Sequence, residues 1–155
     1  MTTLFIDADA CPVTREAITV ARSHGLAVVL VGNGTQSFDK HLHRNGVEAI
    51  QVGQGRDSAD FAIVERLAPG DVVVTQDIGV AAMALGRGAG ALSPRGRVFY
   101  TATIDAEMAV RHAEQKYRRA GGRTGGPPKF TEEDREHFVE SLERVIRDRR
   151  AAPGA

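Results

Sequence analysis

The chain has 155 residues, close to the usual size of one domain, so a single domain spanning 1–150 is expected. Hydrophobic residues make up 42% of the chain and charged residues 26%, a balance that excludes a wholly disordered protein. The net charge is zero, which excludes an indiscriminately basic nucleic-acid coat, and charges or glycines interrupt every apolar run before the roughly 20 residues that a membrane helix needs.

Short apolar runs alternate with helical patterns along the first two thirds of the chain. The runs are β-branched or aliphatic and are typical of buried parallel strands. The predicted strands cover 4–6, 28–31, 47–52, 72–74 and 98–101. The predicted helices, most of which end at glycine or proline, lie within 12–24, 34–46, 58–67 and 78–85. This alternation predicts an α/β fold, a three-layer sandwich with a mainly parallel central sheet and right-handed crossovers.

The last third of the chain has a different character. Two amphipathic helices are predicted, one over 104–119 and one at the C-terminus over 131–150. The segment 120–130 between them is rich in glycine, proline and basic residues and is predicted to form a loop. Residues 151–155 are expected to be a frayed tail.

Aspartates follow the predicted strands. Asp7 closes the first strand with Asp9 two residues later, Asp77 follows the strand at 72–74, and Asp57 and Asp60 begin the helix after the third strand. Ligands of open α/β sheets bind outside the carboxyl ends of the strands, so we expect these side chains at one edge of the sheet. Two carboxylates about 4 Å apart repel by about 4 kcal/mol at an effective dielectric near 20, so convergence implies a cation or a shared proton. Oxygen ligands alone suit Mg²⁺ or Mn²⁺.

Helix capping is the other explanation of these aspartates. Aspartate is a preferred N-cap, and Asp9, Asp57 and Asp77 each lie just before or at the start of a helical pattern. Asp60 is also explained as an acid in a first turn. Asp7 ends an apolar strand with no helix beginning beside it, so capping does not account for Asp7. For the other four aspartates, both explanations stay open at this point.

Four stretches of the sequence together resemble the bacterial YaiI/YqxD family of uncharacterised proteins; they are Phe5–Val13, Asp57–Val64, Val74–Ile78 and Gly125–Phe130. This family looks like a distant branch of the PIN-like nuclease superfamily. The resemblance implies a PIN-like parallel sheet between helices, with strand-end aspartates that bind Mg²⁺ or Mn²⁺ and cleave RNA. It implies catalytic roles for Asp7, Asp60 and Asp77. PIN nucleases usually add a glutamate on an earlier helix; this sequence has no clear counterpart, and Asp9 or Asp57 would have to substitute.

Positive charge is concentrated toward the C-terminus. Residues 1–110 carry 9 basic and 12 acidic side chains, whereas 111–155 carry 11 and 8. Five basic residues without an intervening acid, predicted to bind the nucleic-acid backbone, are Lys116, Arg118, Arg119, Arg123 and Lys129. A solvated flexible linker is the alternative explanation of this segment.

The function predicted from these features is metal-dependent hydrolysis of phosphodiester bonds in RNA. Asp7, Asp60 and Asp77 would hold one or two Mg²⁺ or Mn²⁺ ions, with the other two aspartates completing the coordination. A non-catalytic RNA- or protein-binding module is an alternative. A haloacid-dehalogenase-like phosphatase fits less well, because it needs a lysine near the end of a later strand and none is predicted there.

The cysteine content and the opening sequence bear on the compartment. Cys11 is the only cysteine, so no intramolecular disulfide forms. The opening MTTLFIDADA has neither the basic start nor the long apolar stretch of a signal peptide. We therefore expect a cytoplasmic protein.

Overall fold

Parallel strands form the centre of the computed structural model, which describes residues 2–9, 11–33, 41, 46–53, 58–126 and 128–151. The strands are β1 (Thr3–Asp7), β2 (Ala27–Gly32), β3 (Val47–Gln51), β4 (Val72–Val74), β5 (Gly90–Leu92) and β6 (Val98–Phe99). They form one sheet in the order β3-β2-β1-β4-β5-β6. All neighbours are parallel except β5 and β6, which pair antiparallel. The predicted mainly parallel sheet is confirmed.

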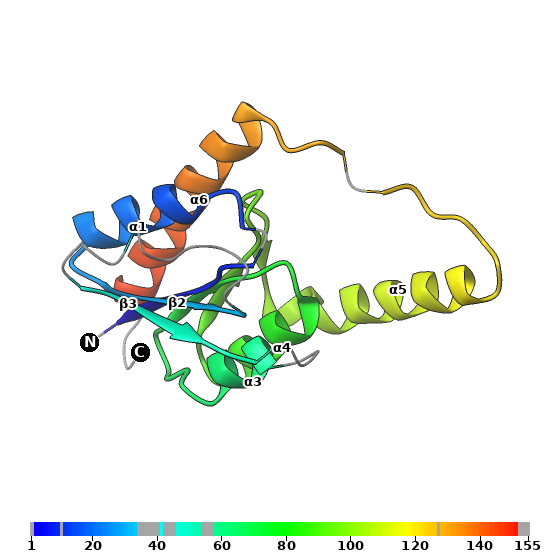
Figure 1. Cartoon of the computed structure of the whole chain (residues 1–155), viewed down its shortest axis with the longest axis horizontal. Coiled ribbons are helices and arrows are strands. Elements are labelled where there is room, and N and C mark those ends of the chain that lie inside the picture. The colour runs from blue at the N-terminus through cyan, green and yellow to red at the C-terminus, as the bar shows by residue number, and fades with distance from the viewer. Residues whose placement is uncertain are drawn as a thin grey trace.

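Helices cover both faces of this sheet (Figure 1). They are α1 (Thr14–Ser23), α3 (Ser58–Val64), α4 (Ile78–Gly86), α5 (Thr101–Arg119) and α6 (Glu132–Ala151). One core lies under α1 and α6, and a second lies under α3, α4 and the first turn of α5. The result is the predicted three-layer α/β sandwich. No helix among the described residues is long and apolar enough to cross a membrane.

The alternation of side chains along β1 decides which face each residue joins. Leu4 and Ile6 are fully buried in the core under α1 and α6. Phe5 belongs to the core under α3 and α4. Asp7, two residues after Phe5, therefore lies on the α3 and α4 side of the sheet, at the carboxyl end of its strand.

Some elements differ from the sequence prediction. Strand β5 was not predicted, because Gly90-Ala91-Leu92 lacks the β-branched residues that indicate a strand. A Cβ at Gly90 would lie 3.1 Å from Val145 Cγ1 of α6, so a small residue lets the helix pack closely on this strand. Helix α5 begins at Thr101, inside the piece predicted to be extended, and Ala151 belongs to α6 rather than to the tail. Most of 34–46, and 152–155, lie outside the described residues.

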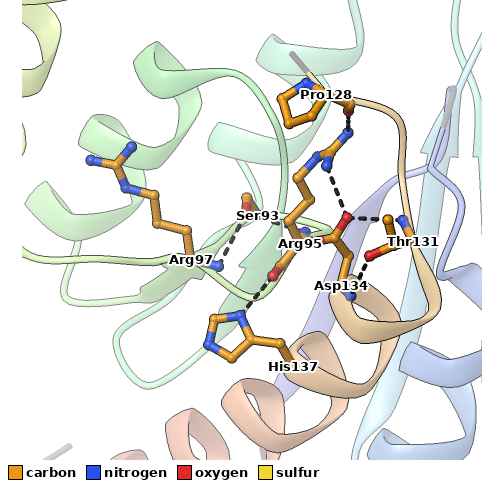
Figure 2. Close-up of polar contacts among 7 residues, drawn as sticks. All are labelled: Ser93, Arg95, Arg97, Pro128, Thr131, Asp134 and His137. Carbon is orange, nitrogen blue, oxygen red and sulfur yellow. Dashed lines mark hydrogen bonds and ion pairs between the residues drawn. The ribbon is translucent and has the colours of Figure 1, made fainter.

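The start of α6 is attached to the loop between β5 and β6 by the polar contacts in Figure 2. Thr131 and Asp134 cap the helix reciprocally: Thr131 N donates to Asp134 Oδ2 (2.9 Å) and Asp134 N donates to Thr131 Oγ1 (3.1 Å). Arg95 Nη1 contacts the same carboxylate oxygen at 2.9 Å, and its Nη2 donates to the carbonyl of Pro128. His137 Nδ1 lies 2.9 Å from the carbonyl oxygen of Arg95. These contacts fix α6 against the sheet.

The close approach of His137 to this loop predicts that Gly96→Ala destabilises the fold. Gly96 has φ +88°, and a Cβ there would lie 2.8 Å from the carbonyl carbon of His137. We expect a loss of roughly 2–4 kcal/mol, from backbone strain and from displacement of α6. Gly25→Ala is the matched control, because Gly25 has φ +72° with no atom within 4 Å of a Cβ, and it should lose only about 1 kcal/mol. Thermal unfolding measures both, and equal losses would contradict the close packing at Gly96.

Candidate functional site

The strand order reverses between β1 and β4. The chain passes from β1 outward to β2 and β3, and then crosses through α3 to β4, on the other side of β1. Where the connections that follow two neighbouring parallel strands run to opposite sides of the sheet, they leave a crevice at the carboxyl ends of those strands. Ligands of open α/β sheets bind in this crevice. Ile6 is in register with Val74, so the residues that follow them, Asp7 and Thr75, lie side by side at this crevice.

Asp7 is held by a hydrogen-bonded connection across the two strands. Thr75 is almost fully buried, and its hydroxyl donates to Asp7 Oδ2 at 3.1 Å. The same hydroxyl oxygen accepts from Asp77 N at 3.0 Å. Burial raises the pKa of the Asp7 carboxyl, the hydrogen bond from Thr75 lowers it, and the negative charges of Asp9 and Asp77 raise it further. The charge on Asp7 is therefore costly and would be stabilised by a cation.

Asp9 does not cap a helix, contrary to the capping alternative for this residue. Helix α1 begins at Thr14 and has Val13 at its N-cap. Asp9 instead accepts from the backbone N–H of Asn33, at 3.0 Å to Oδ2 and 3.3 Å to Oδ1. This contact joins the loop after β1 to the residue that follows β2.

Asp77 is the N-cap of α4, as the capping explanation predicts. Its Oδ1 accepts from Gly79 N at 2.8 Å and from Val80 N at 3.2 Å. The cap uses Oδ1 alone among the described contacts, so the other carboxylate oxygen can face a ligand. Capping and binding are therefore compatible at this residue, and the cap fixes where the carboxylate lies.

Three of the five predicted aspartates border one cavity. The cavity has a volume of about 300 Å³ and is lined by Asp7, Asp9, Gln76, Asp77 and Pro94; we call it the aspartate cavity. No group of three or more acidic, histidine or cysteine side chains among the described residues is placed so that it could hold a metal ion. The site as it stands is thus an open acidic cavity rather than a closed metal cage.

The two aspartates predicted near α3 are placed differently. Asp60 is half-buried in the first turn of α3, where an acid complements the helix dipole. It is not among the described residues that line the aspartate cavity, although α3 begins on the carboxyl side of β3 and so at the same edge of the sheet. Asp57 lies outside the described residues.

A second, larger cavity of about 610 Å³ adjoins the first, and the two share Gln76 and Pro94. Four arginines line this arginine cavity; they are Arg95, Arg97, Arg111 and Arg118. Only Arg118 was among the predicted nucleic-acid-binding residues; Lys116, Arg119, Arg123 and Lys129 are exposed and do not line it. The other three arginines were missed because they are scattered in sequence. The one available signal was the spacing of Arg111 and Arg118, seven residues apart on one helix face.

Comparison with known sequences identifies the family of the chain. A sequence model described as "Uncharacterized BCR, YaiI/YqxD family" matches residues 5–148. The chain belongs to the YaiI/YqxD family. The family membership suggested by the four sequence stretches is therefore confirmed. No solved structure matches the chain.

Relatives from several bacteria share nearly the whole length of this YaiI/YqxD protein. A UPF0178 protein of Exiguobacterium sibiricum is 45% identical over 146 residues, covering 94% of this chain and 97% of its own. One from Rhodopseudomonas palustris is 41% identical over 156 residues, covering 99% and 97%. One from Caulobacter vibrioides is 43% identical over 152 residues, covering 97% of each chain. These names give no activity.

The raised pKa of Asp7 predicts that Asp7→Asn stabilises the metal-free protein at neutral pH. An aspartate whose folded pKa exceeds its unfolded value, near 3.8, binds an extra proton in the folded state, so stability falls as the pH rises through that interval. Asparagine removes this loss and still accepts the Thr75 hydrogen bond. We expect Asp7→Asn to melt a few degrees higher than the parent protein at pH 7, since a stability change of about 1 kcal/mol shifts the melting temperature by about 2–4 °C. Below the unfolded pKa of aspartate, the two proteins should melt at the same temperature.

The control for this measurement is Asp148→Asn, which removes an exposed carboxylate of α6. Its melting temperature should follow that of the parent protein at every pH. A variant Asp7→Asn that melts below the parent at pH 7 would show that the Asp7 charge is already compensated in the folded protein.

Proposed function

We propose that this YaiI/YqxD protein is a metal-dependent nuclease that hydrolyses phosphodiester bonds of RNA in the aspartate cavity. The observation that carries the proposal is the position of Asp7, Asp9 and Asp77 around one cavity, at the crevice between β1 and β4, directly beside a cavity lined by arginines. Phosphodiester hydrolysis needs a cation at the reacting phosphate and positive charge along the backbone. The resemblance of the family to PIN-like nucleases supports the same assignment.

The donor atoms of the aspartate cavity suit a hard divalent cation. Its polar side chains, Asp7, Asp9, Gln76 and Asp77, offer oxygen ligands, which Mg²⁺ and Mn²⁺ prefer. Mg²⁺ keeps several waters and is usually bound by only one or two carboxylates, so a closed cluster of three is not required. Asp7 and Asp77 would hold the ion, with the others acting directly or through water. Asp60, in the first turn of α3, and Asp57, which lies outside the described residues, remain in the proposal as further acids.

The chain contributes fixed carboxylates to the reaction. A bound ion would acidify a water molecule and stabilise charge on the phosphate oxygens. Thr75 orients Asp7, and the N-terminal N–H groups of α4 orient Asp77, so neither side chain has to be ordered when a ligand binds. Because Asp7 is half-buried beside two other acids, binding of a cation relieves repulsion that the free protein carries.

A non-catalytic RNA-binding module is the second candidate, favoured by the lack of a closed metal cluster among the described residues. Such a module would use the arginine cavity without hydrolysis. It would bind RNA equally well with Mn²⁺ or with chelator, and it would release the RNA intact. The nuclease proposal requires turnover.

Cleavage of single-stranded RNA in the presence of Mn²⁺ tests the nuclease proposal. Activity should disappear with chelator, and Asp7→Asn and Asp77→Asn should each lower the rate by roughly a hundredfold or more, because each removes a charged ligand. Asp148→Asn should keep the parent rate. Equal activity in all the variants would point to a contaminating nuclease, and a pure protein inactive on RNA and DNA with several divalent metals would refute the proposal.

Thermal unfolding of Asp77→Asn separates the two roles of Asp77. Asparagine caps a helix about as well as aspartate but is a poorer ligand for a hard cation. The variant should therefore melt no lower than the parent without metal and gain less stability when Mn²⁺ is added. Asp60→Asn should show the same pattern if Asp60 belongs to the site. An equal Mn²⁺ response in the parent and in Asp77→Asn would leave Asp77 with the capping role alone.

A further inference from the structure

The arginine cavity lies where α5 leaves the body of the protein and the chain returns to α6. In Figure 1, α5 projects outward and the following segment runs back as a separate arm to the start of α6. Most of the lining comes from α5, from the loop 93–97 and from the returning segment, represented by Gly125 and Phe130, and the rest comes from Pro12, Gln76 and Phe99. The cavity therefore brings together parts of the chain that are distant in sequence.

The arginines of this cavity differ in how far their charge is already compensated. Arg95 is committed to Asp134 and to the carbonyl of Pro128 (Figure 2), and Arg97 is paired with Glu107. Arg118 donates one hydrogen bond, to Thr124. Within the described part of the chain, Arg111 has no hydrogen bond or ion pair.

Arg111 and Arg118 are seven residues apart and lie on the same face of α5. Glu114 lies between them on that face and offsets one of the two charges. Arg95 and Arg97 are each paired with an acid, so the lining keeps one net positive charge, from Arg111 and Arg118 against Glu114. The uncommitted guanidinium donors of α5 can thus form charge-assisted, bidentate hydrogen bonds with an anion such as phosphate.

Neither of the two aromatic side chains that line this cavity, Phe99 and Phe130, offers a free surface for a base. Phe99 is buried in the core under α3 and α4. The guanidinium groups of Arg95 and Arg135 lie over the ring of Phe130, at 5.6 Å and 5.3 Å from its centroid. Stacking of a base on this ring would require displacing them. The cavity is therefore suited to the charged backbone of a nucleic acid and not to reading its bases.

We propose that the arginine cavity binds the phosphate backbone of single-stranded RNA beside the cleavage site, with Arg111 and Arg118 as the phosphate-binding residues. The inference rests on the proposed function, because the two cavities adjoin at Gln76 and Pro94 and a strand bound in the arginine cavity would lie next to the aspartate cavity. A volume of about 610 Å³ is in the range of small-molecule sites, enough for about two nucleotides and too small for a duplex. Contacts to phosphates make the binding independent of sequence.

Binding of a fluorescent 12-nucleotide single-stranded RNA, measured with chelator present, tests this site without cleavage. Arg111→Gln and Arg118→Gln should each weaken binding about tenfold and lower the slope of log affinity against log salt by roughly 0.7. Arg147→Gln is the charge-matched control, because Arg147 is exposed on α6 and lines neither cavity; its affinity should change less than about twofold. A duplex of the same length should bind more weakly than the single strand.

Three outcomes would overturn the assignment. Equal losses of RNA affinity in Arg111→Gln and in the control Arg147→Gln would show that the binding is general electrostatic attraction. Losses in Arg123→Gln as large as those in Arg111→Gln would assign binding to the whole basic segment rather than to the cavity. Tighter binding of the duplex would contradict the size argument.

The Mn²⁺-induced rise in melting temperature separates this inference from the proposed function. Arg111→Gln and Arg118→Gln should keep the full response to Mn²⁺, since neither lines the aspartate cavity. If the RNA-binding pattern appears in a protein that cleaves nothing, the phosphate site stands and the nuclease proposal fails. If cleavage is found but the arginine variants bind like the parent protein, the proposed function stands and this inference fails.

Discussion

The parallel pairing of β1 with β4 determines what the carboxyl edge of the sheet can do. This pairing places Asp7, the last residue of β1, beside Thr75, the residue after β4. The Thr75 hydroxyl therefore donates to Asp7, and the same hydroxyl oxygen accepts from Asp77 N. Two acids that are distant in sequence are thereby kept near each other by three connected groups, against their mutual repulsion. Hydrophobic packing under α1 and α6 stabilises this arrangement, since Ile6 and Val74, which precede Asp7 and Thr75, are fully buried in that core.

The second cavity depends on a different set of contacts. Arg95 holds the segment before α6 through Pro128 and Asp134, and His137 contacts its backbone carbonyl (Figure 2). This attachment fixes one part of the cavity lining, while α5 contributes Arg111 and Arg118, whose guanidinium groups have fewer partners than that of Arg95. One arginine therefore shapes the cavity, and others are available to a ligand. These two roles follow from the hydrogen-bond and ion-pair partners of each arginine, and not from its position in the sequence.

Much of the fold could be predicted from the sequence, because buried parallel strands produce continuous apolar runs and helices produce periodic ones. The runs at β1, β2 and β4 were clear for this reason. Strand β5 was missed because its small residues are required by the close packing of α6 on this strand. That requirement comes from the tertiary structure and leaves no local pattern in the sequence. The early start of α5 at Thr101 was missed because no side chain caps that end.

The residues of the candidate site were predictable where the end of a strand determines their position. They were not predictable where segments distant in sequence come together. Asp7, Asp9 and Asp77 follow strands and reach one cavity as expected. Whether Asp77 is a cap or a ligand could not be decided from sequence, since both explanations require an aspartate before a helix. The arginine cavity escaped notice because its cations come from α5 and from the loop 93–97, which only the folded chain brings together.

Crystals soaked in Mn²⁺ and examined for anomalous scattering would test the central claim most directly. We expect one strong peak in the aspartate cavity, bonded to carboxylate oxygens of Asp7 and Asp77, with waters completing the coordination. The same crystals would show whether Asp60 and Asp57 approach the ion. A map with no peak in this cavity at millimolar Mn²⁺, or with Mn²⁺ bound only elsewhere on the surface, would contradict the metal-dependent account.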